Sequence, residues 1–245
     1  MVDYLYDGSF EGLLTCIYHH YYTDRASGIF HEKSYQQTML GGFFKVDTDR
    51  EKAARVYEAI EKKISPYDLR RVYKAFLCEE ENKEYMILQY VVMGFKVGSS
   101  ISMLHGNPVV FAVQAMEKKI NVEKERMLQF VRFSVLSNNV LYAEIEPDHD
   151  VTELIAEHFC DRFKNDPFII RDVKRNKALV AYQKKWYITD FSEKEMPALS
   201  DGERQYQRLW KQYFENIAII ERKNSRCQRN FMPQRYWKHL TEMKG

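Results

Sequence analysis

The chain has 245 residues, of which 45% are hydrophobic and 29% charged, a composition that excludes an intrinsically disordered protein. Its formal charge of +2 hides an asymmetry, because residues 221–245 carry seven Lys or Arg against two Glu, a net charge of +5. The four cysteines lie more than sixty residues apart, which excludes a CxxC metal clip or a local iron–sulfur motif.

The sequence also predicts where the protein works. Its first ten residues are acidic and rich in tyrosine, without the basic start and apolar centre of a secretory leader. The longest apolar stretch runs from Tyr85 to Phe95 and is interrupted by Gln89, so it is too short to cross a bilayer. We therefore expect a soluble, cytoplasmic protein with reduced cysteines and no membrane contact.

Residues 1–126 predict a mainly helical lobe that is opened by a short strand. The strand is expected at residues 3–7. Gly8-Ser9 is expected to form a turn with an N-cap, which leads into a helix whose apolar residues recur at helical spacing. Residues 24–46 are expected to form loops. Four further helices are predicted from caps and apolar spacing: from a capping box of Thr48 and Glu51 to Ile64, from Ser65-Pro66 onward, from Lys83 to Val97, and from Asn107-Pro108 to about Lys119.

Residues 127–245 predict a lobe built on an antiparallel sheet, so that the fold class is α+β. Hydrophobic periodicity changes to two near residue 127 without a Gly/Pro linker, and we expect the two lobes to pack as one unit. A linker-like stretch follows only at residues 192–202. The predicted elements are a hairpin of Phe130–Leu136 and Val140–Glu146, a helix from Asp150 with Glu153 to about Lys164, a meander of Phe168–Asp172, Ala178–Tyr182 and Trp186–Asp190, and a helix from Ser200 with Glu203 to about Ile220.

Two acidic segments of the second lobe are candidates for chemistry. Pro147-Asp148 and Asp172-Val173-Lys174 match the loose nuclease pattern PD…(D/E)xK, in which carboxylates hold a divalent metal and a lysine assists the attacking water. The predicted helix between them favours a structural role instead. Asp148-His149-Asp150 offers metal donors, but Asp150 is more simply a helix cap. We expect no tightly bound metal or cofactor, because the cysteines and histidines lack ligand spacing.

The basic tail is the strongest candidate for a binding surface. Its cations can pair with phosphates, and its aromatic rings can stack on unpaired bases. The alternative is a solvated segment whose aromatic residues dock back on the core. The tail residues predicted to contact nucleic acid are Arg222, Lys223, Arg226, Arg229, Arg235, Tyr236 and Trp237.

Several segments together resemble one bacterial family. They are Tyr6-Asp7-Gly8-Ser9-Phe10-Glu11-Gly12, Pro147-Asp148-His149-Asp150 with His158-Phe159 and Arg162-Phe163, Ile170-Arg171-Asp172-Val173-Lys174-Arg175, Trp210-Lys211-Gln212-Tyr213-Phe214, Glu221-Arg222-Lys223-Asn224, and Met232-Pro233-Gln234-Arg235-Tyr236-Trp237. In this order and spacing they look like the "probable DNA metabolism protein" family, a domain of unknown function. The resemblance covers essentially the whole chain.

The resemblance implies a role beside DNA-repair enzymes. Members of that family are encoded next to a radical S-adenosylmethionine (radical SAM) protein of DNA modification or repair, or are fused to a uracil-DNA-glycosylase-like domain. A DNA-binding accessory protein without catalytic activity of its own, acting with such a partner, is therefore expected, and Asn224 joins the expected binding residues. Two alternatives stay open: an enzyme of unrecognised type that acts on DNA, with Asp148, His149, Asp172 and Arg175 as candidate catalytic residues, and a protein–protein adaptor without nucleic-acid contact.

Overall fold

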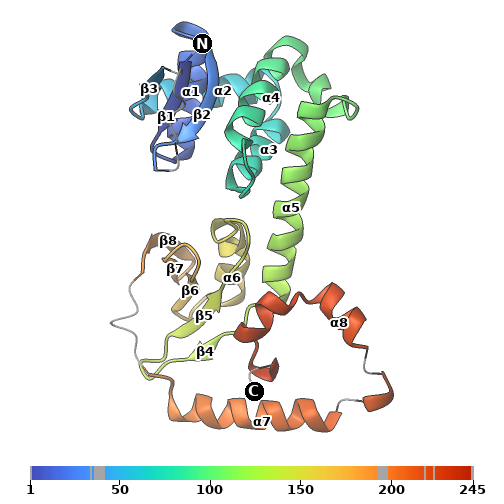
Figure 1. The fold of residues 1–245 in the computed structure, drawn as a ribbon. Helices are drawn as coiled ribbons and strands as arrows, with labels where there is room; N and C mark the ends of the chain where they lie inside the picture. The colour runs from blue at the N-terminus through green and yellow to red at the C-terminus, as the bar shows by residue number, and fades with distance from the viewer. Residues whose placement is uncertain are drawn as a thin grey trace. The chain divides into compact units, whose positions relative to one another are not determined.

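The computed structural model describes residues 2–33, 35, 42–191, 198–217, 219–222 and 224–243 (Figure 1). The chain divides into two compact units, Met1–Asn121 and Val122–Gly245. The first combines helices with a small sheet and the second a larger sheet with helices, so the predicted α+β class is confirmed. Most of the predicted linker at residues 192–202 lies outside the described residues.

A three-stranded parallel sheet opens the first unit, in the order β2-β1-β3. The strands are β1 (Val2–Tyr6), β2 (Ala26–His31) and β3 (Phe43–Lys45), and helix α1 (Phe10–Tyr22) connects the first two. The predicted loop at residues 24–46 is therefore wrong where β2 and β3 lie. Pairing with β1 on both of its sides outweighs the weak strand propensity of a segment that contains glycines.

Helix caps fix the starts of the next helices. Ser9 caps α1 and Ser65 caps α3, as predicted, each accepting a backbone N–H three residues on. The predicted capping box at Thr48 is wrong by one residue. Asp49 accepts from the N–H groups of Glu51 and Lys52 at 3.0 and 3.1 Å, because its carboxylate reaches both donors, while the Thr48 hydroxyl donates to Asp7 at 2.8 Å.

The remaining helices of this unit form its larger part. They are α2 (Arg50–Lys63), α3 (Pro66–Leu77), α4 (Lys83–Val97), the 3₁₀ turn η1 (Gly98–Met103) and α5 (Pro108–Phe130). The last helix continues eleven residues beyond the predicted end at Lys119, into the second unit. Ile120, Glu123 and Met127 extend its buried stripe at helical spacing, which the sequence analysis did not follow.

Helix α4 and η1 together form a helical run, Lys83–Met103, that is long and apolar enough to cross a bilayer by length and composition alone. The prediction that the longest apolar stretch, Tyr85–Phe95, is too short to cross a bilayer is therefore wrong by length. Core helices pass the same test, and Tyr90 of this run is fully buried with its hydroxyl bonded to Asp68 of α3 at 2.6 Å. The buried residues of this run, among them Ile87, Leu88 and Ile101, lie in the core of its unit.

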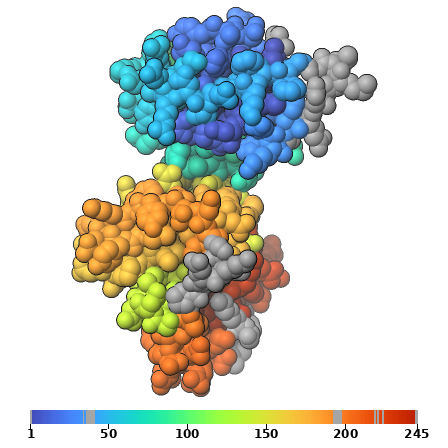
Figure 2. Space-filling model, turned by 90° about the vertical axis from the view of Figure 1, so that its left-hand side faces the viewer, coloured from blue at the N-terminus to red at the C-terminus, as the bar shows by residue number. Residues whose placement is uncertain are grey.

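The second unit is built on a five-stranded sheet in the order β4-β5-β6-β7-β8. The strands are β4 (Ser134–Val135), β5 (Leu141–Ile145), β6 (Phe168–Asp172), β7 (Lys177–Tyr182) and β8 (Lys185–Asp190). The hairpin of β4 with β5 and the meander of β6 to β8 are antiparallel, as predicted. Strands β5 and β6 run parallel, which corrects the prediction of a wholly antiparallel sheet. The outer strand β8 faces solvent along most of its length (Figure 2).

The parallel pair follows from the connection between its strands. Turn η2 (Glu153–Ile155) and helix α6 (Ala156–Arg162) cross over from β5 to β6, and a helical crossover returns the chain in the same direction. Asp150 was predicted to cap this helix, and that prediction is wrong. Both of its carboxylate oxygens instead accept from Lys177 of β7. Phe159, Phe163, Phe168 and Phe133 form an aromatic cluster under the sheet.

Helical segments complete this unit. They are α7 (Asp201–Ile217), η4 (Ile220–Arg222), α8 (Ser225–Phe231), η5 (Gln234–His239) and η6 (Thr241–Met243). Ser200 caps α7 as predicted, by accepting from the N–H of Glu203 at 3.1 Å. All four cysteines of the chain are free thiols, and only Cys227 is exposed.

Candidate functional site

The parallel pairing of β5 and β6 brings the two predicted acidic segments together. Ile145 pairs with Asp172 in the sheet register, so the loop after β5 and the turn after β6 leave the same edge. Asp172 is fully buried there. Its carboxylate pairs with Arg175 at 3.0 Å and also accepts the Arg175 backbone N–H at 3.2 Å. The Asp172 carboxylate is thus held by a cation of its own turn.

Arg175 and Lys174 fasten this turn to the loop after β5. The Arg175 guanidinium donates to the backbone oxygens of Pro147 and Asp148 at 3.3 and 2.9 Å, and the Lys174 ammonium donates to the same Asp148 oxygen at 2.9 Å. A nuclease needs its carboxylates and lysine to face a metal and a water. Here the lysine contacts a backbone carbonyl, so the geometry supports the structural interpretation of the PD…(D/E)xK pattern.

Glu123 of α5 is the centre of this polar network. Its side chain is only 3% exposed, yet it accepts hydrogen bonds from the backbone N–H groups of Asp148 and His149 at 2.8 and 2.7 Å. The Tyr236 hydroxyl donates to it at 2.7 Å, and Arg235 at 3.3 Å. Burial alone would raise the pKa of Glu123, but the hydrogen bonds from Tyr236, Asp148 and His149 outweigh it, and the pKa is lowered.

The same contacts show which tail residues belong to the core. Tyr236 is 2% exposed and Leu240 is fully buried, and the two lie in and after η5. Arg235 pairs with Asp148 at 2.7 Å, and Lys238 pairs with Glu146. Trp237 is half-buried and donates its indole N–H to the backbone oxygen of Met232 at 2.9 Å. The Tyr236 ring is therefore not available to stack on a base, and its prediction as a nucleic-acid contact is wrong.

Three tail arginines remain exposed without a carboxylate partner in the described part of the chain. They are Arg222 of η4 and Arg226 and Arg229 of α8. Arg226 and Arg229 are three residues apart, so they share one side of the helix. Asn224, expected at the binding surface, caps α8 by accepting the Cys227 N–H at 2.9 Å, and Lys223 lies outside the described residues. This set of three, called the arginine triad below, is the exposed part of the predicted surface.

A pocket of about 510 Å³ opens elsewhere in the same unit. The C-terminal end of α5, helix α6 and helix α7 contribute its walls. Aromatic rings, two arginines and two glutamines line it, together with a few aliphatic and acidic groups. The pocket was not predicted from the sequence, since it depends on the placement of α7 against segments forty to eighty residues earlier. The aromatic spacing within α7 was the available signal.

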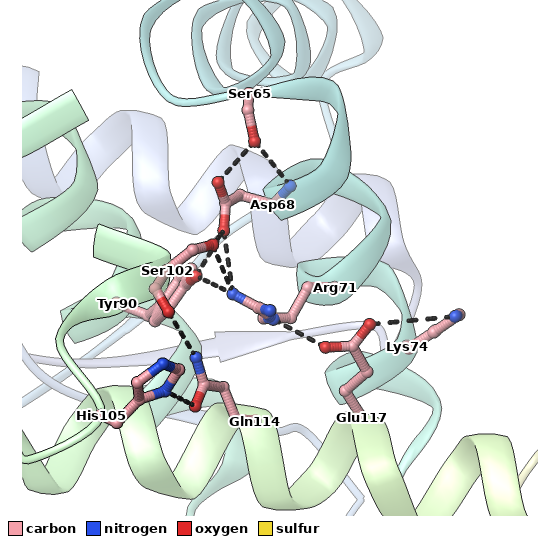
Figure 3. A network of polar contacts seen from close by, with 9 residues as sticks. All are labelled: Ser65, Asp68, Arg71, Lys74, Tyr90, Ser102, His105, Gln114 and Glu117. Carbon is pink, nitrogen blue, oxygen red and sulfur yellow. Dashed lines mark hydrogen bonds and ion pairs between the residues drawn. The ribbon is translucent and has the colours of Figure 1, made fainter. Parts of the chain in front are cut away.

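A second polar cluster, in the first unit, was also missed (Figure 3). The buried Asp68 carboxylate accepts from Tyr90 at 2.6 Å, Ser102 at 2.7 Å and Arg71 at 3.1 Å. Arg71, itself buried, also pairs with Glu117 of α5 at 2.7 Å. Each charge thus meets an opposite charge, and the cluster ties α3, α4, η1 and α5 together.

The described residues contain no group of three or more His, Cys, Asp or Glu side chains arranged to hold a metal ion. The four predicted catalytic candidates lie close together at the β5–β6 edge, but their known contacts are internal. Asp148 and Asp172 face cations, His149 donates its backbone N–H to Glu123, and Arg175 holds the loop.

Comparison with known proteins identifies relatives only at the level of family. A model described as a domain of unknown function (DUF4130) matches residues 81–242, well over half of the chain. No curated protein sequence matches. Among solved structures, the pGpG-specific phosphodiesterase PggH from Vibrio cholerae is similar with a TM-score of 0.35 and 9% sequence identity, over 86% of this chain and 98% of that one. A likeness of this size says nothing about the activity of the present chain.

Proposed function

The chain belongs to the DUF4130 family of unknown function, and from that premise we propose that it is a DNA-binding accessory protein. The arginine triad carries the proposal. Of the five arginines and lysines described in the tail, Arg235 and Lys238 are neutralised by acids of the second unit, whereas the triad is not. Exposed arginines without acid partners are available to phosphates, which they can bind through two parallel hydrogen bonds.

The charge distribution supports the same surface. The second unit contains 22 Lys and Arg against 19 Asp and Glu, a net charge of +3, while the first unit has a net charge of −1. Within the second unit the excess lies in the tail. A positive region of this kind attracts a polyanion and releases its counterions on binding.

The polar residues at the β5–β6 edge favour binding over catalysis. Asp172, Arg175 and Glu123 form internal contacts that hold the turn, the loop and the tail. In the proposed role, the chain presents DNA to a catalytic partner. The family resemblance suggests a radical SAM enzyme or a uracil-DNA-glycosylase-like domain as that partner, acting in the cytoplasm.

The experiment is a salt titration of binding to a short DNA. Replacing Arg222, Arg226 and Arg229 with alanine should reduce the slope of log affinity against log salt by about 2 to 3, since each phosphate contact contributes about 0.7 to 0.9. The matched control replaces Arg50, Arg55 and Arg70, three exposed arginines of the first unit, and should leave the slope unchanged. A triad variant that keeps both its fold and the wild-type slope would refute the proposal and favour a protein–protein adaptor.

A further inference from the structure

The pocket between α5, α6 and α7 has a wall of aromatic rings. Phe163 stacks in parallel on Phe159, with ring centres 6.4 Å apart and an angle of 8° between the planes. On the α7 side, Tyr206 is 66% exposed and Trp210 is 37% exposed. A planar ligand can therefore reach aromatic surface from both sides of the pocket.

Trp210 is held in place although it faces solvent. Its indole N–H donates to Glu242 at 3.3 Å, and its ring stacks on Tyr213 with centres 5.7 Å apart. A ring fixed in this way loses little freedom when a ligand stacks on it. None of the residues of α7, all of which the structure describes, is buried, so its aromatic face is open.

The polar groups around the rings complement an anion. The Arg162 guanidinium lies 5.6 Å from the Phe163 ring centre and has no carboxylate partner among the described residues. Arg132 pairs with Glu242 at 3.2 Å and donates to the Gln129 carbonyl at 3.0 Å, so Arg162 is the cation of the lining that can meet an anion. Glu203, the acidic residue that lines the pocket, already accepts two hydrogen bonds, one from the Val135 N–H and one from the Gln207 amide.

Gln207 leaves one hydrogen-bonding group available. Its amide nitrogen donates to Ser134 at 3.0 Å and to Glu203 at 2.7 Å. The amide oxygen has no donor among the described residues, so it can accept from a ligand. The pocket thus combines aromatic surface with placed polar groups, a combination that suits a small planar ligand carrying polar atoms.

From these features we infer that the pocket holds one unpaired nucleobase of bound DNA, with Arg162 at a flanking phosphate. Aromatic rings stack on any base, while the Arg162 guanidinium and the Gln207 amide oxygen favour a nucleotide over an apolar peptide side chain. This pocket is a different surface from the arginine triad, although its proposed role rests on the proposed DNA binding. With it, the protein should prefer single-stranded or locally unpaired DNA to a fully paired duplex.

The test uses oligonucleotides in three forms: a single strand, a duplex with one unpaired 2-aminopurine, and the fully paired duplex. Wild-type protein should bind the first two more tightly than the third and quench the 2-aminopurine fluorescence. Trp210→Leu and Tyr206→Leu should each weaken binding to the unpaired forms by about 5- to 150-fold, the effect of losing one stacked base, and should leave the salt slope unchanged.

The control is Tyr187→Leu, a substitution at an exposed tyrosine of β8 that neither lines the pocket nor contacts Trp210. It should preserve both affinity and quenching, and melting curves identify any variant that fails to fold. Arg162→Gln offers a second variant at an exposed position and should lower the salt slope by about 1. If wild-type protein binds all three DNAs equally, with a slope set by the arginine triad, the pocket inference fails while DNA binding stands. If wild-type protein binds none of them, the proposed function itself fails.

Discussion

The hydroxyl of Tyr236 donates a 2.7 Å hydrogen bond to the carboxylate of Glu123, which lies 113 residues earlier in the chain. Both side chains are buried, so a basic tail that resembles a solvated segment in sequence is in part a core element. The tail thus has two roles in the structure. Its η5 segment closes the core, and η4 and α8 present the arginine triad.

Replacing Tyr236 with phenylalanine should lower the free energy of unfolding by about 1 to 3 kcal/mol, because a buried carboxylate loses a donor while the ring remains. Urea denaturation measures the change. The matched control, Tyr213→Phe, removes a hydroxyl from an exposed tyrosine and should change stability by less than about 0.5 kcal/mol. Equal stability of the Tyr236 variant and the wild type would show that the tail is not docked.

The lowered pKa of Glu123 predicts a pH dependence at the acid side. Burial raises this pKa, but the bonds from Tyr236, Asp148 and His149 bring it below the usual 4.5. A carboxyl whose pKa is depressed by folding stabilises the protein above its unfolded pKa, and this stability is lost as the pH falls through the folded pKa. Urea midpoints of wild type should therefore decline below about pH 4.5.

Glu123→Gln separates this contribution from those of other carboxylates. The variant should be less stable than wild type at pH 7 and should lose less stability between pH 6 and pH 3. Parallel curves for the two proteins over that range would contradict the assignment of the acid-sensitive group.

Replacing Arg71 with alanine should destabilise the protein by about 3 to 5 kcal/mol, because Asp68 and Glu117 would remain buried without their shared cation. Arg70→Ala, at the exposed neighbouring position, is the control and should have little effect. Thermal melts of the two variants measure the loss of stability in each. A small effect at Arg71 would mean that the cluster of Figure 3 contributes little to folding.

Gly8 is required by the turn between β1 and α1. Its φ is +88°, and an added Cβ would lie 2.3 Å from the His31 ring. Gly8→Ala should therefore lower the free energy of unfolding by at least about 1 to 3 kcal/mol, measured by urea denaturation. Gly106→Ala, where a Cβ meets nothing within 4 Å, is the comparison and should be close to neutral.

The sequence predicted those features that depend on neighbouring residues in the chain, such as helix caps. Ser9 and Ser65 were identified as caps because a cap depends on residues within one helical turn. The bounds of α4, Lys83 and Val97, were predicted instead from its run of apolar residues. Thr48 was mistaken for the cap in place of Asp49, since both residue types can accept the same N–H groups and only tertiary contact with Asp7 separates them.

Contacts between distant segments were not predictable in this way. Strand β3 is three residues long and exists through its pairing with β1. The meeting of Asp148 with the Asp172 turn depends on the parallel direction of β5 and β6, which alternation of apolar residues does not encode. Glu123 was overlooked because a glutamate among charged neighbours resembles a solvated helix face until its partners are known.

The docking of η5 also orders events during synthesis. The core of the first unit lies within residues 1–121, so that unit can fold while the ribosome is still making the rest of the chain. The core of the second unit needs Tyr236 and Leu240, and it can close only after these residues have emerged. Until then Glu123 and Asp148 lack their partners Tyr236 and Arg235, and the core of the second unit stays incomplete.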